Sequence, residues 1–140
     1  MRALLAVTLL LAGCSTTVAG TPVEPTDREL VQNYFAALNT AESQGPQAQL
    51  AFFRHTQHPD FTNLICDLGG ATIDAKPGMS TFQPDNEWAP QTGGRPRGTV
   101  YVVAVALSVH KNGQVLGEQV GSQRLVVLDG SVYGFMPCLR

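Results

Sequence analysis

Residues 99–137 read TVYVVAVALSVHKNGQVLGEQVGSQRLVVLDGSVYGFMP. Three runs rich in β-branched and aromatic residues are separated by Asn112-Gly113 and Asp129-Gly130, two dipeptides that favour two-residue hairpin turns. The pattern predicts antiparallel strands over 99–109, 114–128 and 131–137. These strands decide the fold class, because a meander of this length must bury one of its faces against other elements.

If both turns contain two residues, the pairing of the strands follows by counting. The count places these residues opposite one another: Val109 and Leu116, Leu107 and Glu118, Val105 and Val120, Tyr101 and Arg124, Val126 and Tyr133, and Arg124 and Phe135. The face that holds these bulky pairs is expected to pack on the helices. A β-bulge at Gly117 or Gly121 is the open alternative, and it would exchange the two faces.

Two helices are predicted before the strands. Thr26-Asp27-Arg28-Glu29 has the form of a capping box, and apolar residues follow at helical spacing over 27–41. A second helix is predicted over 47–57, after Pro46, which suits a first helical position. Residues 63–73 predict a short hairpin, and 75–98, with four prolines and four glycines, predict a long loop. These elements indicate a single α+β domain over 26–140.

The composition limits the classes of partner. The chain has 140 residues, of which 44% are hydrophobic and 14% charged, and its formal net charge is −2. This length favours one domain, and the chain is too apolar and too weakly charged to be disordered. Because no stretch is rich in Lys or Arg, nucleic acid is not expected as a partner.

The amino terminus carries one Arg and a short apolar run that ends in Leu11-Ala12-Gly13-Cys14. The run is shorter than the about 20 residues that a membrane-spanning helix needs. Its last four residues resemble the lipobox of bacterial lipoproteins. The resemblance implies a signal peptide over 1–13, diacylglycerol on the Cys14 thiol, and a further acyl chain such as palmitate on the Cys14 amino group. It also implies an outward-facing protein anchored in the cell membrane.

Residues 14–25 are polar, contain two prolines and show no apolar period, so they predict a flexible tether between the lipid and the domain. The start of this tether, over 14–22, is similar to that of many mycobacterial surface lipoproteins.

Two cysteines remain once Cys14 carries lipid. An even pair in an exported chain favours a disulfide, so Cys66 and Cys138 are expected to be bonded. The bond would close a loop of about 73 residues and contribute ~4 kcal/mol in the chain-entropy account. A redox or metal-binding pair is the alternative, but the two cysteines lie far apart in the sequence.

The order of elements resembles the nuclear-transport-factor-2-like (cystatin-like) superfamily. The resemblance covers 26–140, and its best local part is 125–134. It implies a cone in which helices fill the hollow of a strongly curved sheet and leave a pocket. Members of the superfamily include isomerases, dehydratases, cyclases and plain binding modules, so the resemblance does not fix a function.

The residues expected near such a pocket are Tyr34, Tyr101, Glu118 and Arg124. The counted register aims Glu118 at the bulky face, where a buried carboxylate would have a raised pKa and could act as a base. The alternative, which we favour, is that Glu118 pairs with Arg124 or lies at an open strand end. We therefore expect no catalytic residue.

One dense polar cluster could hold a divalent metal ion. His55 and His58 share a helix face, and Asp60 follows closely. The alternative is a solvated helix end at which His favours the helix dipole. No ligand set completes a zinc motif, so we expect neither a metal nor a cofactor.

The leading expectation is a lipid-anchored module that binds an apolar small molecule or an envelope protein, and that is not an enzyme. One alternative is an isomerase- or cyclase-type enzyme that uses an inward carboxylate or His. The other is an accessory structural domain without a ligand. The sequence leaves the oligomeric state open.

Overall fold

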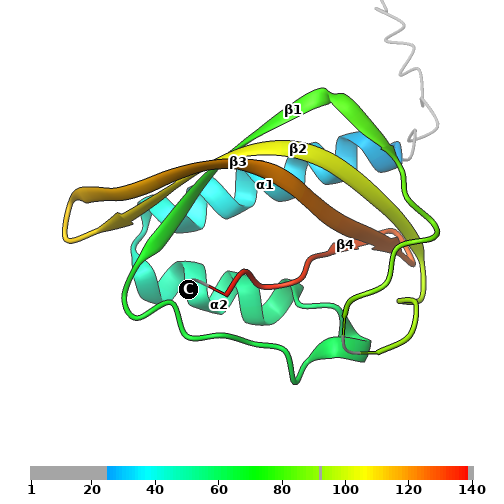
Figure 1. Ribbon diagram of the computed structural model, residues 1–140, viewed down its shortest axis with the longest axis horizontal. Helices are drawn as coiled ribbons and strands as arrows, with labels where there is room; N and C mark the ends of the chain where they lie inside the picture. The colour runs from blue at the N-terminus through cyan, green and yellow to red at the C-terminus, as the bar shows by residue number, and fades with distance from the viewer. Residues whose placement is uncertain (1–24, 92, 139–140) are drawn as a thin grey trace, which may run out of the picture.

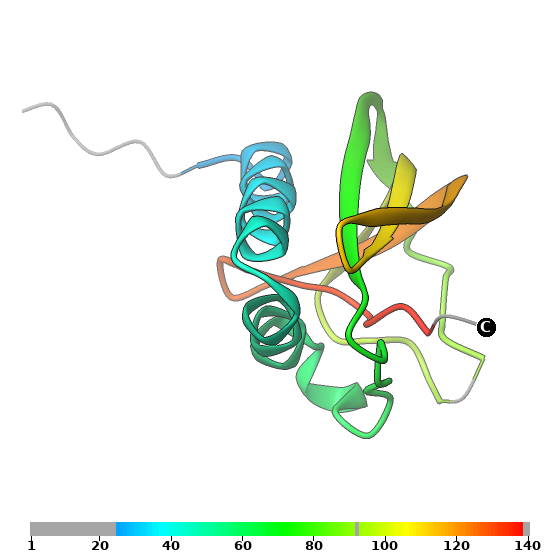
Figure 2. The same cartoon turned by 90° about the vertical axis from the view of Figure 1, so that its left-hand side faces the viewer.

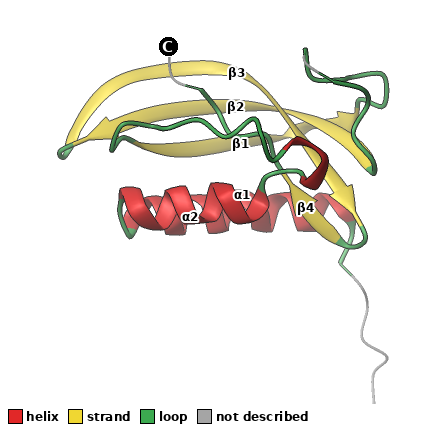
Figure 3. Cartoon of the chain, turned by 90° about the horizontal axis from the view of Figure 1, so that it is seen from below, coloured by secondary structure: helices red, strands yellow, loops and turns green. Residues whose placement is uncertain are grey.

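Figure 1 shows a computed structural model of the chain, which describes residues 25–91 and 93–138. The helices are α1 (Asp27–Ser43), α2 (Pro46–Thr56) and the short 3-10 helix η1 (Pro59–Phe61). The strands are β1 (Thr72–Pro84), β2 (Thr99–Lys111), β3 (Gln114–Leu128) and β4 (Ser131–Tyr133). They form one antiparallel sheet in the order β1-β2-β3-β4. The helices pack on one face of this curved sheet, which confirms the α+β class (Figures 2 and 3).

The predicted signal peptide, Cys14 and residues 14–24 of the predicted tether lie outside the described residues. Helix α1 begins with the predicted capping box, in which Thr26 accepts from the Glu29 N–H and Glu29 accepts from the Thr26 N–H. Both predicted helices are confirmed, with ends that differ from the prediction by one or two residues.

The core lies between the helices and the concave face of the sheet. Its centre is formed by buried apolar side chains of α1, α2, β2 and β3: Val31, Tyr34, Phe35, Leu38, Phe53, Val103, Val105, Leu125 and Val127. Burial of each large side chain contributes roughly 1.5–3 kcal/mol. Val105, on the face expected to pack on the helices, lies in this core as predicted. Tyr133, expected in the same cluster, instead packs against the His58 ring.

The predicted hairpin over 63–73 is wrong, and the loop predicted over 75–98 is confirmed only for 85–91 and 93–98, because a single long strand, β1, occupies Thr72–Pro84. The direction of its backbone groups explains why the strand tolerates Pro77. The two residues that flank a two-residue hairpin turn exchange two hydrogen bonds, and Lys111 and Gln114 are this pair at the β2–β3 turn. Lys111 and the other odd-numbered residues of β2 therefore direct their backbone groups towards β3, and the even-numbered residues direct theirs towards β1. By alternation, the odd-numbered residues of β1 between Thr72 and Gly78, before its register shifts, direct their backbone groups away from β2. Pro77 is one of them, so its missing N–H costs no bond of the sheet.

Two side-chain amides cover this outer edge of β1. Asn39 in α1 accepts from the Ala75 N–H at 2.9 Å and donates to the Ala75 carbonyl at 2.8 Å. Gln49 in α2 does the same for Ile73, at 2.7 Å and 2.6 Å, and its side chain is fully buried. Each amide therefore takes the place of one residue of a neighbouring strand.

The counted register of β2 and β3 is wrong beyond the turn. His110 pairs with Val115 as counted, but Val109 pairs with Gly117, so Leu116 is an extra residue in a β-bulge. The bulge turns Leu125 and Val127 towards the helices. Without it, the charged Arg124 would occupy that buried face, so the burial of two apolar side chains favours the bulged register.

The last strand is shorter than predicted, although Val126 pairs with Tyr133 as expected. At Gly134 the chain leaves β3: the Gly134 N–H donates to the Thr56 carbonyl at 2.8 Å, and its carbonyl accepts from the His58 N–H at 3.0 Å. A Cβ at this position would collide with the Tyr34 hydroxyl, so the path requires glycine. The predicted pairing of Arg124 with Phe135 is therefore wrong, and within residues 25–91 and 93–138 no strand other than β4 pairs with the outer edge of β3.

Candidate functional site

The bulge at Leu116 decides which side chains of β3 face the helices. Gly117, Gln119, Gly121 and Gln123 now lie on the concave face in place of the bulky residues that were counted there. The two glycines leave that face without side-chain volume, and a Cβ on Gly117 would meet no atom within 4 Å. The β2–β3 hairpin also extends past the ends of both helices, as Figures 1 and 3 show. Both features leave the concave face open at this end.

A hollow of about 610 Å³ occupies this part of the concave face, and we call it the inner groove. It is lined by Ile73, Leu107, Val109, Gly117, Glu118, Gln119, Pro137 and Cys138. Aliphatic side chains of β1 and β2 form its floor, and the carboxy-terminal segment forms the facing wall. Glu118 lies exposed at its rim, and its carboxylate accepts from the Ser108 hydroxyl at 3.5 Å.

The facing wall is fixed by a disulfide. Cys66 and Cys138 are bonded, with their Cα atoms 5.4 Å apart, so the predicted pair is confirmed. The bond ties the carboxy-terminal segment to the irregular stretch that precedes β1. This crosslink restrains the segment that contributes Pro137 and Cys138 to the inner groove.

A second hollow, of about 310 Å³, adjoins the inner groove and opens at the edge of β3 between Gln119 and Arg124, and we call it the edge hollow. Trp88 and Phe135 stand in its wall, with ring centroids 4.9 Å apart. The Arg124 guanidinium lies 5.8 Å from the centre of the Trp88 ring, and its Nε donates to Asp85 at 3.1 Å. Trp88 thus joins the long loop to the sheet.

The residues expected to line one pocket lie in separate places. Tyr34 is buried in the core, where burial raises its pKa to about 12. Tyr101 stacks on Phe82 and donates to Asp27 at 2.6 Å, and its pKa is likewise raised to about 12 by burial and by this carboxylate. Glu118 and Arg124 lie beside the two hollows but do not pair with each other, so that predicted ion pair is wrong.

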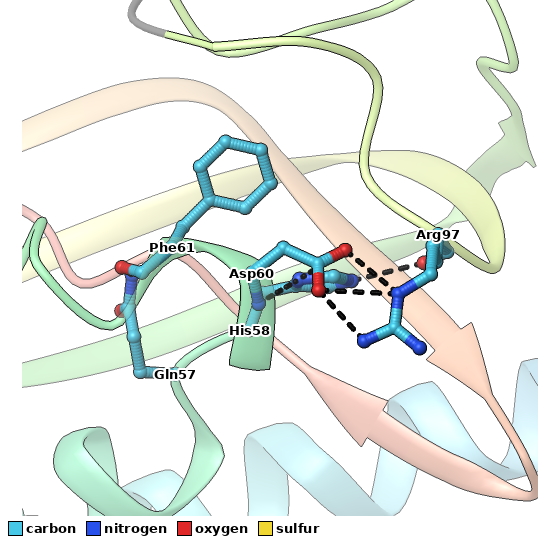
Figure 4. Close-up of polar contacts among 5 residues, drawn as sticks. All are labelled: Gln57, His58, Asp60, Phe61 and Arg97. Atoms are coloured by element: carbon cyan, nitrogen blue, oxygen red, sulfur yellow. Dashed lines mark hydrogen bonds and ion pairs between the residues drawn. The ribbon is translucent and has the colours of Figure 1, made fainter.

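The residues considered for a metal ion have other partners, which Figure 4 shows in close-up. His58 is fully buried, its Nδ1 accepts from the Asp60 N–H at 3.2 Å, and its Nε2 lies 2.9 Å from the Arg97 carbonyl. Both ring nitrogens of His58 are thus engaged with protein groups and are not available to a metal ion. His55 is exposed on α2. Within residues 25–91 and 93–138, no group of three or more His, Cys, Asp or Glu side chains is placed to hold a metal ion.

Asp60 is instead one half of an ion pair. The Arg97 guanidinium donates from Nε and Nη2 to the Asp60 carboxylate at 2.7–3.1 Å. These hydrogen bonds hold the pKa of Asp60 below its usual value. The cluster joins the end of α2 to the long loop before β2, and its role is to position that loop.

The sequence pattern does not predict the inner groove, because the counted register places Gly117 and Gln119 on the opposite face of the sheet and assigns Pro137 to the last strand. The signal was the alternation of glycine and glutamine over 117–123, a run with little apolar volume that could face either side. It also missed the edge amides, although Gln49 stands alone as a polar residue within the apolar stripe of α2.

Among the helices of the described residues, none is long and apolar enough to span a membrane. Comparison with models of protein families, with curated proteins and with solved structures finds no match for this chain.

Proposed function

We propose that this chain is a lipid-anchored binding module of the bacterial cell envelope, and that its inner groove takes an apolar ligand such as an acyl chain. The observation that carries the proposal is the groove itself. It is an apolar hollow of about 610 Å³. Gly117 leaves it free of side-chain volume, and the Cys66–Cys138 disulfide holds the carboxy-terminal segment that forms its wall. The domain would be a small variant of the nuclear-transport-factor-2-like cone, supported by its two leading helices and curved antiparallel sheet.

The anchor is supported by the sequence Leu11-Ala12-Gly13-Cys14 and by the polar tether that follows it. Two or more acyl chains on Cys14 give stable anchoring, since each buried CH₂ contributes ~0.8 kcal/mol. A tether of this length would hold the groove near the outer membrane surface, where apolar molecules partition. The localisation and the binding role therefore support each other.

The chemistry of the groove favours binding over catalysis. Its floor consists of aliphatic side chains, and each ligand CH₂ that leaves water there contributes ~0.8 kcal/mol. Glu118 reaches its rim, but the Glu118 side chain projects from the convex face of β3, where its neighbour is the Ser108 hydroxyl. A site of this kind selects a ligand by shape and apolar area.

Native mass spectrometry of the full-length chain, purified from membranes, tests the proposal. We expect a fraction of the protein to carry an apolar molecule that is lost on denaturation, while the denatured chain keeps the covalent lipid mass on Cys14. Gly117→Trp would fill the groove and abolish the non-covalent adduct. Ala106→Trp adds the same ring to the convex face of β2 and is expected to leave the adduct unchanged.

Retention of the adduct in Gly117→Trp at the level of the parent, or loss of it in both variants, would refute the groove as the site. Absence of lipid mass on Cys14 would refute the anchor.

A further inference from the structure

The outer edge of β3 is unpaired over most of its length. Strand β4 pairs only with 126–128, and the chain then leaves the sheet at Gly134. Leu128 and Ser131 flank a two-residue turn, so they exchange two hydrogen bonds and fix the phase of β3. By alternation, the even-numbered residues from 118 to 124 direct their N–H and C=O groups outward. Within the described part of the chain, no hydrogen bond reaches these groups.

The other edge of the sheet, formed by β1, is protected against pairing with a further strand. On β1 the outward groups are covered by Asn39 and Gln49, and Pro77 removes a third donor. Residues 114–125 of β3 contain neither Pro nor Lys, and Glu118 and Arg124 are their charged residues. An exposed edge without such protection is a template for another strand.

The surface of this stretch also lacks a partner. Residues 111–122 are all exposed, and Val120 is exposed at 79%, the highest value among the large hydrophobic side chains of the described residues. Val115 and Leu116, at the tip of the hairpin, are exposed at 59% and 60%. Val120 lies within the unpaired stretch of β3, so it is the exposed apolar side chain that a strand added at this edge would cover.

We propose that the partner is a second copy of this chain, whose β3 pairs antiparallel with the first about a twofold axis at Gly121. The charges of the strand select this occupant and this register. Glu118 and Arg124 are equidistant from Gly121, so self-pairing places each of them opposite the other residue of the second copy. The two ion pairs form on the convex face, where both side chains project.

The remaining residues fit the same register. Val120 lies opposite Ser122 of the second copy and diagonally across from its Val120, which covers the most exposed apolar side chain. Gln119 lies opposite Gln123 on the concave face, where their amides can bond each other. Arg124 donates to Asp85 through Nε, and no described residue bonds to its two Nη groups, which stay free for Glu118 of the second copy.

The interface would join the two sheets into one and place both inner grooves on the same side. The edge hollow supplies room beside Gly121 and Arg124 for the incoming strand. This pairing does not depend on whether the inner groove holds a ligand, so each of the two proposals can be refuted without the other.

Disulfide trapping in native membranes tests the register with the full-length chain. In the proposed register, Gly121 lies opposite Gly121 of the second copy as a non-hydrogen-bonded pair. The two Cα atoms would be about 4.5 Å apart, which suits a disulfide. We expect Gly121→Cys to form a crosslinked species of twice the monomer mass on mild oxidation. The matched control is Gly117→Cys, on the same face of the same strand. Its copy lies eight residues along the strand, about 26 Å away, so it should not crosslink. Neither glycine has a positive φ or an atom within 3.4 Å of an added Cβ.

Adding Glu118→Lys to Gly121→Cys places like charges opposite each other twice, and we expect it to lower the crosslinked fraction several-fold. Equal crosslinking at positions 117 and 121, or no crosslink at 121, would overturn the proposal. An unchanged yield with Glu118→Lys would overturn the register. Capture of a protein of another mass by Gly121→Cys would show that the edge serves a different partner and would overturn self-pairing.

Discussion

Single side chains carry much of the organisation of this domain, and Gln49 is the clearest case. Its amide is fully buried in α2 and, within residues 25–91 and 93–138, makes the only hydrogen bonds to the outward backbone groups of Ile73. An apolar side chain of similar size would leave a backbone donor and an acceptor buried without partners. Each such group costs about 1–3 kcal/mol.

We therefore expect Gln49→Leu to lower the free energy of unfolding by about 2–5 kcal/mol. Gln47→Leu, at an exposed position of the same helix, is the control and should change it by less than about 0.5 kcal/mol. Urea denaturation followed by circular dichroism measures both. Equal effects of the two substitutions would show that the amide does not secure the edge of β1.

The stability of the folded domain depends on pH through Asp60. Its pKa is lowered by hydrogen bonds from Arg97, so the folded state binds this proton less readily than the unfolded state. The stabilisation is present above the unfolded pKa, near 3.8, and is lost as the pH falls through the lower folded pKa. Stability should therefore fall with acid in this window, and Asp60→Asn should flatten that part of the profile. Thermal melts between pH 2 and about pH 6 test this, and a profile of unchanged slope would contradict it.

At the scale of elements, the disulfide holds the wall of the inner groove. Cys66 and Cys138 are separated by 72 residues, and a crosslink across a loop of this size contributes about 2–4 kcal/mol to stability. We expect the double change Cys66→Ala and Cys138→Ala to lower the denaturation midpoint, and the oxidised parent treated with a reductant to match it. A midpoint that does not respond to reductant would show that the bond does not constrain the fold.

The elements with local signals could be predicted from the sequence. The capping box and apolar spacing place α1, and the two Asx-Gly turns place β2, β3 and β4. Strand β1 could not be predicted, because Pro77 and Gly78 have the composition of a loop. Its position depends on a free edge and on the amides of Asn39 and Gln49, which are tertiary features. The sequence allows a bulge at Gly117 or Gly121 as an alternative but does not place it at Leu116, because the energy of the bulge depends on which face the helices cover.

The prediction of the candidate site was also limited by features that depend on tertiary contacts. The cysteine pair follows from counting, and it is confirmed. The inner groove does not, because a one-residue change of register exchanges the faces of β3. That change moved Glu118 and Arg124 to the convex face and brought Gly117 and Gly121 to the concave one. Glu118 and Arg124, which were expected near a pocket, thereby became candidates for an interface.

For the whole molecule, the account combines an anchor, a groove and an edge. The lipid on Cys14 would hold the domain at the membrane, the inner groove would bind an apolar chain, and the edge of β3 would pair with a second copy. The groove is the central claim, since it depends on the bulge, on two glycines and on the disulfide together.

Photo-crosslinking with a clickable, photoactivatable fatty acid tests this claim most directly. Membranes that contain the full-length chain are irradiated, and the labelled residues are mapped by mass spectrometry, with a sample kept in the dark to identify acyl chains attached at Cys14. The account predicts labels on Leu107, Val109 and Pro137, which line the inner groove. Labels confined to Val115 and Val120 on the exposed hairpin, or to the anchor alone, would contradict it.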